Sequence, residues 1–500
     1  MNNRKMTYGL IGLYIAVVLF AGCIPEESLE WSADGSVGLL QTKESLYIVD
    51  GNNGGLTEIA RGKILPWPGI SKDGNLIVYS KEVNCPNLAE GLKLLPIGEV
   101  KMIDRYAGQM KERLLIDTST AEKFLSDKNF LDKEPFIDEN FKGFNEEYRN
   151  WVIRYMCEKA DKKLVERLGD AVIAMAGAKE IKYSKLVVVP RNDPNNQKVV
   201  AVSVSQIWKS CFSPNGKYIT YLVAGLKDTH NRSMVKFDLY VASLPQNIKA
   251  MHLASNVAFG YDWRSDSRAV VYMQAEQGDY DNDKFVPGTV KETTIVDAND
   301  NLLSEAIGTD KQDSVAACRC TGCTDGFAGV VFYWWMKVQY GQSGRILFSS
   351  AVMKFPSSKI DEERASLFYY DTTAGTVAEV LPAGIARDSD NLHLFSLSAD
   401  GRRVLLPMDK NRFALYGFGE SSANVLVPEN ECFGDNPPKI APAWKGRDEV
   451  SCLVSEKSHF LTGGGQKEHN RKEIVILNAK GEFKRILSEK WPDEIMKNFE

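Results

Sequence analysis

Three cysteines in one short run form the densest cluster of metal-ligating residue types in the sequence. Cys318, Cys320 and Cys323 follow the spacing C-x-C-x-x-C. Three thiolates could bind Zn²⁺, with a fourth ligand from elsewhere in the chain. In an exported protein, however, a disulfide or a buried thiol is the favoured interpretation. We therefore expect no metal site and keep these three cysteines as weak zinc candidates.

A second run has the acidic alternation that opens a calcium-binding loop. Residues Asp279 to Asp283 read D-Y-D-N-D. A calcium loop of this type requires Gly at its sixth position and Glu at its twelfth, where this chain has Lys284 and Val290. We therefore interpret the run as a solvated hairpin tip.

No motif of a known enzyme class stands out. The five histidines lack metal-ligand spacing, and the nucleophile motif G-x-S-x-G does not occur. Gly463–Gly465 lacks the Lys-Ser/Thr that completes a phosphate-binding loop. We expect a protein that needs no cofactor and is not an enzyme. A site assembled from distant residues stays open, because sequence does not reveal it.

The first residues form an export signal that ends at a cysteine. Two basic residues precede an apolar segment from Gly9 to Phe20, which has the length of a signal-peptide core. The following Ala-Gly-Cys resembles the bacterial lipobox, although Phe20 stands where Leu, Ile or Val is usual. The resemblance implies that residues 1–22 are removed and that Cys23 is acylated, which anchors the protein to a membrane. An uncleaved anchor helix is the alternative.

The remaining cysteines fit an oxidising location. Nine cysteines less Cys23 leave eight, and an even number outside the cytoplasm permits disulfides. Their pairing cannot be derived from one sequence. Cys432 and Cys452 flank one short segment and are the preferred pair.

These residues must be positioned by a fold that a recurring motif reveals. An aromatic or aliphatic residue is followed by a short polar stretch, usually ending in Asp-Gly or Asn-Gly, and then by an apolar strand. The motif begins at Trp31, Ile70, Phe212, Trp263 and Leu397. Asp or Asn caps a tight turn, and Gly supplies its left-handed conformation. The leading ring is expected to be buried between neighbouring units, so the motif is structural.

Each repeat predicts four short antiparallel strands, which is the composition of a propeller blade. In the first unit, Leu46–Val49 and Leu56–Ile59 provide the third and fourth strands. The fifth motif is placed at Cys323–Gly326, followed by one long strand from Val330 to Val338. A degraded seventh motif begins at Trp444. The count is therefore seven units.

The second unit is interrupted by an insertion. A strand at Leu76–Ser80 finds its partner only at Leu186–Val189, and residues 85–184 between them carry apolar residues at helical spacing. One interpretation is a helical subdomain that packs on the propeller. The other is a platform or cap that binds a partner. The candidate contact residues of such a platform are Tyr148, Trp151 and Tyr155.

The repeats resemble the WD-like repeats of TolB-type β-propellers, in which an aromatic residue precedes Ser-Pro-Asp-Gly and a strand. The resemblance runs from about Ser28 to Leu487, without the insertion. It implies a periplasmic or surface propeller used for protein contacts. We expect an all-β, seven-bladed propeller of four-stranded antiparallel blades, with six or eight blades as alternatives and an α-helical insertion in blade 2.

The predicted organisation and function follow from these features. The segments are residues 1–22 (signal peptide), 23–84 (blade 1 and the start of blade 2), 85–184 (helical insertion), 185–490 (remaining propeller) and 491–500 (short terminal helix). The net charge of −5 gives no footprint for nucleic acid. We expect a lipid-anchored module of the bacterial cell envelope that binds or scaffolds envelope proteins. Ile24 after Cys23 slightly favours the outer membrane over the inner one. The alternatives are a lyase-like or glycosidase-like enzyme with its site in the central channel, and a purely structural envelope protein.

Overall fold

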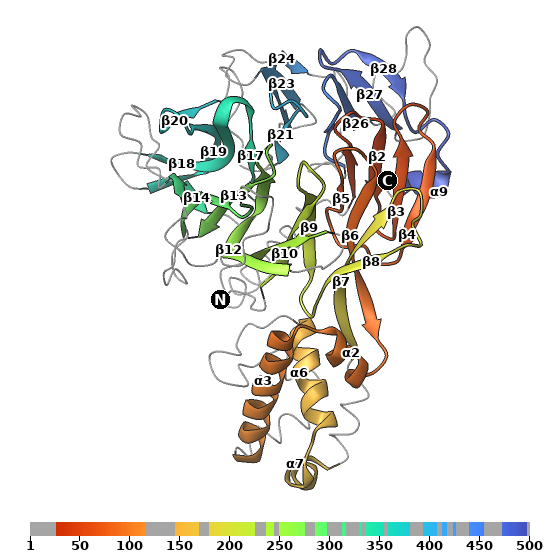
Figure 1. The fold of residues 1–500 in the computed structure, drawn as a ribbon, viewed down its shortest axis with the longest axis vertical. Coiled ribbons are helices and arrows are strands. Elements are labelled where there is room, and N and C mark those ends of the chain that lie inside the picture. The colour runs from red at the N-terminus through yellow and green to blue at the C-terminus, as the bar shows by residue number, and fades with distance from the viewer. Residues whose placement is uncertain are drawn as a thin grey trace, which may run out of the picture. The chain divides into compact units, whose positions relative to one another are not determined.

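A computed structural model describes residues 27–116, 146–169, 180–225, 237–244, 250–275, 286–297, 313–316, 330–332, 336–354, 359–380, 394–407, 413–417, 424–426, 440–454 and 473–497. Within them the strands form six antiparallel sheets, five of four strands and one of eight (Figure 1). The protein is an all-β propeller with a helical insertion, as the sequence predicts. It divides into two compact units, Met1–Arg61 with Val380–Glu500 (unit 1) and Gly62–Glu379 (unit 2).

Unit 1 contains the first, sixth and seventh predicted repeats, each as one four-stranded sheet. Their strands are β1 (Ser28–Trp31), β2 (Val37–Gln41), β3 (Ser45–Asp50) and β4 (Leu56–Arg61); β21 (Ser396–Leu397), β22 (Arg403–Pro407), β23 (Phe413–Gly417) and β24 (Asn424–Leu426); and β25 (Ala443–Lys445), β26 (Glu449–Val454), β27 (Glu473–Asn478) and β28 (Phe483–Ile486). The predicted terminal helix is confirmed as the short α9 (Asp493–Met496).

Unit 2 contains the other repeats and the insertion. Its strands are β5 (Gly69–Ile70), β6 (Leu76–Cys85), β7 (Ile181–Pro190) and β8 (Lys198–Ser203); β9 (Ile207–Phe212), β10 (Tyr218–Ala224), β11 (Phe237–Ser243), β12 (Ala250–Trp263), β13 (Ala269–Ala275), β14 (Val286–Thr294), β15 (Asp313–Ala316) and β16 (Val330–Phe332); and β17 (Val338–Tyr340), β18 (Arg345–Lys354), β19 (Lys359–Asp371) and β20 (Thr376–Glu379).

The long strand β12 explains why seven repeats form six sheets. Its first part pairs with β11, and its second part pairs with β13. Between the two parts the register shifts, and Asn256 adopts a left-handed conformation with φ 57°. The third and fourth repeats therefore share one strand. Counted as hydrogen-bonded sheets, the propeller has six blades, which is one of the alternatives the sequence left open.

The fifth repeat corrects one sequence-based prediction. The expected single strand from Val330 to Val338 is wrong, because β16 pairs with β14 in the eight-stranded sheet and β17 opens the next blade. The turn of that blade is Gly341–Gly344, where Gly344 has φ 72° and the Gly341 N–H donates to the Arg345 carbonyl at 2.7 Å. The turn keeps the left-handed glycine of the repeat motif but lacks its Asp. Cys323–Gly326, the predicted turn, lies outside the described residues.

The Asp of the repeat motif closes its turn through hydrogen bonds. The Ser32 hydroxyl donates to Asp34 Oδ1 at 2.7 Å, and the Ser36 N–H donates to the same oxygen at 3.0 Å. The Ser36 N–H holds the pKa of Asp34 below its ordinary value. The same arrangement recurs at Ser71/Asp73, Ser213/Asn215 and Ser398/Asp400. The motif is therefore structural, as the sequence predicts.

The leading tryptophans join neighbouring repeats. In unit 1, Trp31 Nε1 donates to Ser451 Oγ at 2.9 Å, which links β1 to β26. In unit 2, Trp263 Nε1 donates to Thr220 Oγ1 at 2.9 Å, which links β12 to β10. The expectation that the ring lies between neighbouring repeats is confirmed.

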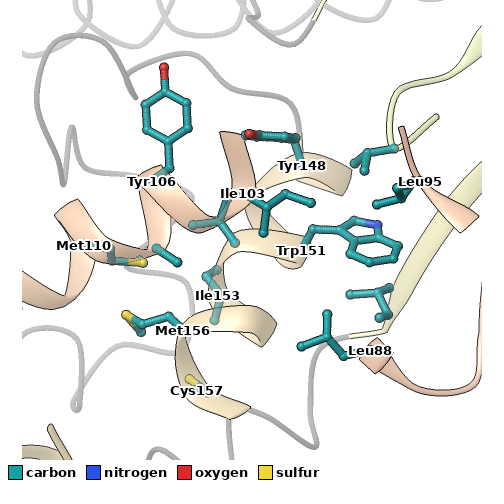
Figure 2. Packing of buried hydrophobic residues seen from close by; sticks show 14 of the residues in the cluster. Leu88, Leu95, Ile103, Tyr106, Met110, Tyr148, Trp151, Ile153, Met156 and Cys157 are labelled. Carbon is teal, nitrogen blue, oxygen red and sulfur yellow. The ribbon is translucent and has the colours of Figure 1, made fainter. Parts of the chain in front are cut away.

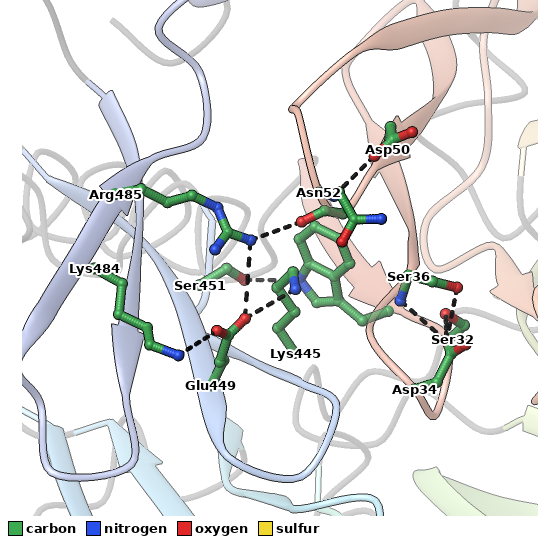
Figure 3. A network of polar contacts seen from close by, with 12 residues as sticks. Ser32, Asp34, Ser36, Asp50, Asn52, Lys445, Glu449, Ser451, Lys484 and Arg485 are labelled. Atoms are coloured by element: carbon green, nitrogen blue, oxygen red, sulfur yellow. Dashed lines mark hydrogen bonds and ion pairs between the residues drawn. The ribbon is translucent and has the colours of Figure 1, made fainter.

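A polar network accompanies Trp31 at the junction between the first and last sheets of unit 1. Glu449 accepts from Lys445 at 2.9 Å and from Lys484 at 2.7 Å (Figure 3). Lys445 Nζ also lies 5.4 Å from the centroid of the Trp31 ring. Arg485 donates to the Gly51 carbonyl at 2.7 Å, which ties the last strand to the β3–β4 turn.

Four described helices leave the sheet between β6 and β7 (Figure 1). They are α2 (Leu88–Leu94), α3 (Ile97–Ile116), α6 (Glu146–Glu158) and α7 (Lys162–Leu168). The predicted pairing around the insertion is confirmed, and the ladder extends from Leu76↔Pro190 to Cys85↔Ile181. None of the helices in the described ranges has both the length and the apolar character that crossing a membrane requires.

Candidate functional site

Several residues singled out from the sequence lie outside the described residues. They are Cys23, Cys318, Cys320, Cys323, Cys432 and the run Asp279–Asp283. Cys452 is buried in β26. Its pairing with Cys432 stays a prediction, because Cys432 lies outside the described residues. Across the described ranges, no three His, Cys, Asp or Glu side chains are grouped so that they could hold a metal ion. Cys85 and Cys157 carry free thiols, and burial raises the pKa of Cys157 to about 11.

The aromatic stripe of the insertion forms its core. Tyr148 and Trp151 are fully buried, among apolar residues of α2, α3 and α6 (Figure 2). Trp151 Nε1 donates to the Lys182 carbonyl at 2.6 Å, which fixes α6 to β7. This burial corrects the interpretation of Tyr148 and Trp151 as partner contacts. Tyr155 is partly exposed and donates to Asp104 Oδ1 at 2.8 Å, so its role in partner binding stays a proposal.

A shielded carboxylate joins the insertion to the propeller. Glu99, in the first turn of α3, accepts from the Ser203 hydroxyl and from the Val204 N–H, both at 2.8 Å. Burial raises the pKa of Glu99 and outweighs these two hydrogen bonds, which would lower it. The insertion is therefore anchored at two points, through Trp151 on β7 and through Glu99 at the end of β8.

The topology of unit 2 gives its blades two different edges. In each blade the first strand leads into the tight turn and the second strand runs back from it. Each blade therefore has one end, along the direction of its strands, where the tight turn lies, and an opposite end. We use "edge" for these two ends. The starts of β5, β9 and β17 lie at the edge opposite the turn, as does the end of β6. The insertion leaves from the end of β6, and we call this edge the insertion edge.

Aromatic rings gather around a lysine near the insertion edge. Trp67 lies just before β5, with its ring centroid 4.1 Å from Phe259 and 6.2 Å from Trp208. Lys209 Nζ lies 5.0 Å from the centroid of Phe259 and 4.7 Å from that of Tyr261. Ammonium groups over aromatic faces are attracted by the ring quadrupole. We call these five residues the aromatic–lysine cluster.

Two members of the cluster have unusual backbone conformations. Trp67 has φ 61° and Lys209 has φ 23°, in a region that side chains with a Cβ rarely adopt. Two hydrogen bonds hold this backbone, from the Lys209 N–H to the Pro66 carbonyl at 3.2 Å and from the Ser210 N–H to the Trp67 carbonyl at 3.1 Å. The segment before β5 thus lies along β9 and presents the Trp67 ring to the cluster.

A carboxylate next to the cluster is fully engaged by the backbone. Asp262 Oδ1 accepts from the Trp263 N–H and Oδ2 accepts from the Tyr340 N–H, both at 2.9 Å. Burial raises the pKa of Asp262 to about 6, although these bonds and the charges of Lys209 and Lys337 oppose the rise. Asp262 therefore holds β17 against β12.

Two glycines allow neighbouring strands to approach closely in this region. A Cβ on Gly69 would lie 2.3 Å from the Ser210 carbonyl oxygen. A Cβ on Gly260 would lie 2.2 Å from Lys337 Cα. The first strands of neighbouring repeats are therefore packed backbone to backbone beside the cluster.

The arrangement can recognise a ligand but lacks a nucleophile paired with a base. Partly exposed Trp67, Trp208 and Phe259 offer flat apolar surfaces, and Lys209 and Lys337 supply positive charge. Sequence reasoning missed the cluster because residues 67, 209, 259 and 337 share no local spacing. Only one feature of the sequence points weakly to the cluster: Trp208 and Lys209 are adjacent in a strand that begins a repeat.

No protein-family model matches the sequence, and no curated protein matches it either. Among solved structures, TolB from Acinetobacter baumannii is similar at 15% identity and a TM-score of 0.35, over 60% of this chain and 58% of TolB. The β-propeller domain of the Trilobed protease from Pyrococcus furiosus is similar at 10% identity and a TM-score of 0.43, over 92% of this chain and 95% of that domain. Oligogalacturonate lyase from Vibrio parahaemolyticus is similar at 10% identity and a TM-score of 0.37, over 76% of this chain and 73% of the lyase.

TolB and β-propeller proteins are thus among the structural neighbours of the chain. These likenesses concern the fold alone. The fold itself is established by the four-stranded blades and the shared strand β12.

Proposed function

We propose that this protein is an exported, lipid-anchored β-propeller that binds another protein of the bacterial envelope at its insertion edge. The observation that carries the proposal is the insertion itself. It has its own apolar core, and two anchors, Trp151 and Glu99, hold it on blade 2. A folded body held at one edge of a rigid scaffold suits recognition.

Exposed apolar residues on the insertion support a role in binding. Ile97 is 75% exposed and Leu94 is 52% exposed, at the corner between α2 and α3. Leu94 and Ile97 are three residues apart in the chain, and a protein interface at this corner would bury both side chains. The export signal and Cys23 support placing this surface outside the cytoplasm, with a lean to the outer membrane.

The test is photocrosslinking in intact cells. A photoreactive amino acid at Ile97 should capture a defined envelope protein, and Leu94→Glu should reduce the yield. The matched control is the same photoreactive residue at Val199, which is 43% exposed on β8 and not on the insertion. Equal capture from both positions, or none from Ile97, would refute binding at this corner.

An enzyme is the second candidate, and one observation favours it. Asp262, with a pKa raised to about 6, lies close to Lys209, and groups that titrate near neutral pH suit acid–base chemistry. Against this role, both Asp262 oxygens already accept backbone N–H groups. Incubation of the full chain with pectic oligosaccharides and with peptides tests it: product formation that Asp262→Asn abolishes would establish the enzyme.

A further inference from the structure

The outward face of α3 carries exposed side chains along its whole length. The helix runs from Ile97 to Ile116, which is about 30 Å at 1.5 Å per residue. Its inward face packs on α6 in the core of the insertion, and residues spaced three and four apart on its other face are exposed (Figure 1). They include Ile97, Lys101, Arg105, Gly108, Glu112 and Ile116. We call these six residues the α3 face.

Both ends of the α3 face are apolar. Ile116 is 82% exposed and Ile97 is 75% exposed, which makes them the two most exposed large hydrophobic side chains among the described residues. A single exposed apolar residue is ordinary on a protein surface. Here the two most exposed ones occupy the first and last positions of one helix, at equal distances from its midpoint. This placement suits burial by a second element that is as long as α3 itself.

The charges on the α3 face are complementary when the helix is reversed end for end. Lys101 is the fifth residue of α3, and Glu112 is the fifth from its end. The two side chains are about 16 Å apart along the helix axis, which is too far for them to pair with each other. Neither forms an ion pair with another described residue. If a second α3 lies antiparallel across the first, Lys101 of each copy comes opposite Glu112 of the other.

The middle of the α3 face has a small residue where the same reversal places a long one. Gly108 is exposed, and a Cβ added to it would meet nothing within 4 Å, so packing inside the chain does not require a glycine there. Glycine in the middle of a helix is less stable than alanine. The arrangement that pairs Lys101 with Glu112 also sets Arg105 of one copy against Gly108 of the other. Arg105 donates to the Tyr106 hydroxyl at 2.7 Å, which holds its side chain on the surface of α3, and the missing Cβ leaves room for it.

We propose that the α3 face binds the α3 face of a second copy of this chain, with the two helices antiparallel around a two-fold axis at their midpoints. Ile97 of each copy then contacts Ile116 of the other, and Lys101 of each copy pairs with Glu112 of the other. The two-fold axis makes every such contact twice. Helices pack against each other through side chains spaced three and four apart, as these are. The inference goes beyond the proposed function, because it needs no other envelope protein.

Sedimentation equilibrium of the purified full-length chain in density-matched detergent measures this self-association. We expect a monomer–dimer equilibrium with a micromolar Kd, since one pair of helices is a small interface. Lys101→Glu and Glu112→Lys each turn two attractive contacts into two repulsive ones. Each variant alone should dimerise at least tenfold more weakly, which corresponds to about 1.4 kcal/mol. The matched control is Lys163→Glu on the exposed surface of α7, which should leave the Kd unchanged.

Mixing the two charge variants tests the antiparallel register. The Lys101→Glu copy is acidic at both positions and the Glu112→Lys copy is basic at both, so every contact between unlike copies is attractive again. An equimolar mixture should therefore dimerise with a Kd close to that of the wild type. Ile116→Ser changes no charge and should also weaken dimerisation at least tenfold. It replaces a charge variant that loses its folded circular dichroism signal.

Three results would overturn the proposal. They are a wild type that stays monomeric up to millimolar concentration, single variants that dimerise as well as the wild type, and a mixture that dimerises no better than its components. Each of them leaves binding of another protein at Ile97 intact, because the sedimentation sample contains only this chain. Conversely, photocrosslinking at Ile97 that captures only a second copy of the chain would reject the proposed partner and support the dimer.

Discussion

Replacement of Glu99 tests how the helical insertion is held on the propeller. In Glu99→Ala, the Val204 N–H and the Ser203 hydroxyl lose the carboxylate that accepts from them. An unsatisfied buried donor costs about 1–3 kcal/mol, so we expect local opening of α3 to become easier by roughly 2–4 kcal/mol. Opening should therefore increase by about 30- to 1,000-fold. The global stability of the propeller should change far less, because the insertion has its own core.

Glu99→Gln is the matched variant. Its amide oxygen can accept from the Val204 N–H and its amide nitrogen can donate to the Ser203 hydroxyl, which rotates freely. The buried charge disappears while both contacts are kept. We expect the α3 amides of this variant to be protected from hydrogen exchange within a few-fold of the wild type. The stability of the joint should no longer depend on pH.

The sign of that pH dependence follows from the raised pKa of Glu99. The folded joint binds a proton more readily than the opened one, so its stability is greatest below the ordinary glutamate pKa. The stability of the joint falls as the pH rises from the ordinary glutamate pKa to the raised pKa of folded Glu99. Above that raised pKa it no longer changes with pH. The neighbouring Tyr148, Tyr221 and Tyr240 have raised pKa values and stay neutral throughout this range.

Hydrogen exchange of the α3 amides, corrected for intrinsic rates and followed from pH 4 to 7.5, measures both effects. Wild-type protection should decline with pH and that of Glu99→Gln should not. The reasoning is refuted if Glu99→Ala protects α3 as well as the wild type does, or if Glu99→Gln keeps the full pH dependence.

Four further changes test other parts of the structure. Gly260→Ala places a methyl group 2.2 Å from Lys337 Cα and should destabilise the chain by about 1–3 kcal/mol in thermal melting. Its control is Gly108→Ala in α3, where the new Cβ has open space around it and should stabilise the helix slightly. Ser267 accepts from the Asn215 N–H at 2.9 Å, so Ser267→Ala should lower the free energy of unfolding by about 1–3 kcal/mol. Ser267 also has φ 64°, which Gly adopts without strain, so Ser267→Gly should lose about 1 kcal/mol less; equal losses would argue against strain. Trp151→Ala should melt the insertion, at a cost of about 3–5 kcal/mol, and leave the β circular dichroism signal; retained α3 protection would contradict its role in the core. Cys23→Ser should leave the export signal uncleaved and abolish labelling by a fatty-acid analogue, and wild-type processing and labelling would reject the lipid anchor.

Local turn chemistry made most of the fold predictable. At Trp31-Ser32-Ala33-Asp34-Gly35 the Asp side chain and the left-handed glycine act within five residues, so one stretch of sequence specifies the turn. The turns that follow Ile70, Phe212 and Leu397, at the ends of β5, β9 and β21, were predicted from the same pattern. The turn at Gly341–Gly344 does not follow this pattern, because it needs only the left-handed glycine and Gly341 donates directly to the backbone.

Features that depend on distant residues were not predictable. Whether β12 breaks between two repeats or continues through them depends on pairing with both β11 and β13, which no local pattern records. Helical spacing around Trp151 correctly indicated an apolar face, but that spacing is the same for a buried core and for an exposed platform. Only the arrangement of α3 against α6 shows that the face is buried.

The two edges of the unit 2 blades carry different kinds of residue, and this difference bears on where binding occurs. At the turn edge, the polar side chains of Asp73, Asn215 and Asp266 are used up in closing turns a few residues long. Little chemistry is left there for a partner. At the insertion edge, Lys209 and Trp67 have positive φ angles, with Lys209 at the register shift between β9 and β10, and the insertion adds a cored body to the same edge. Because the turn edge is occupied by these short closed turns, we expect a partner of unit 2 to bind at the insertion edge.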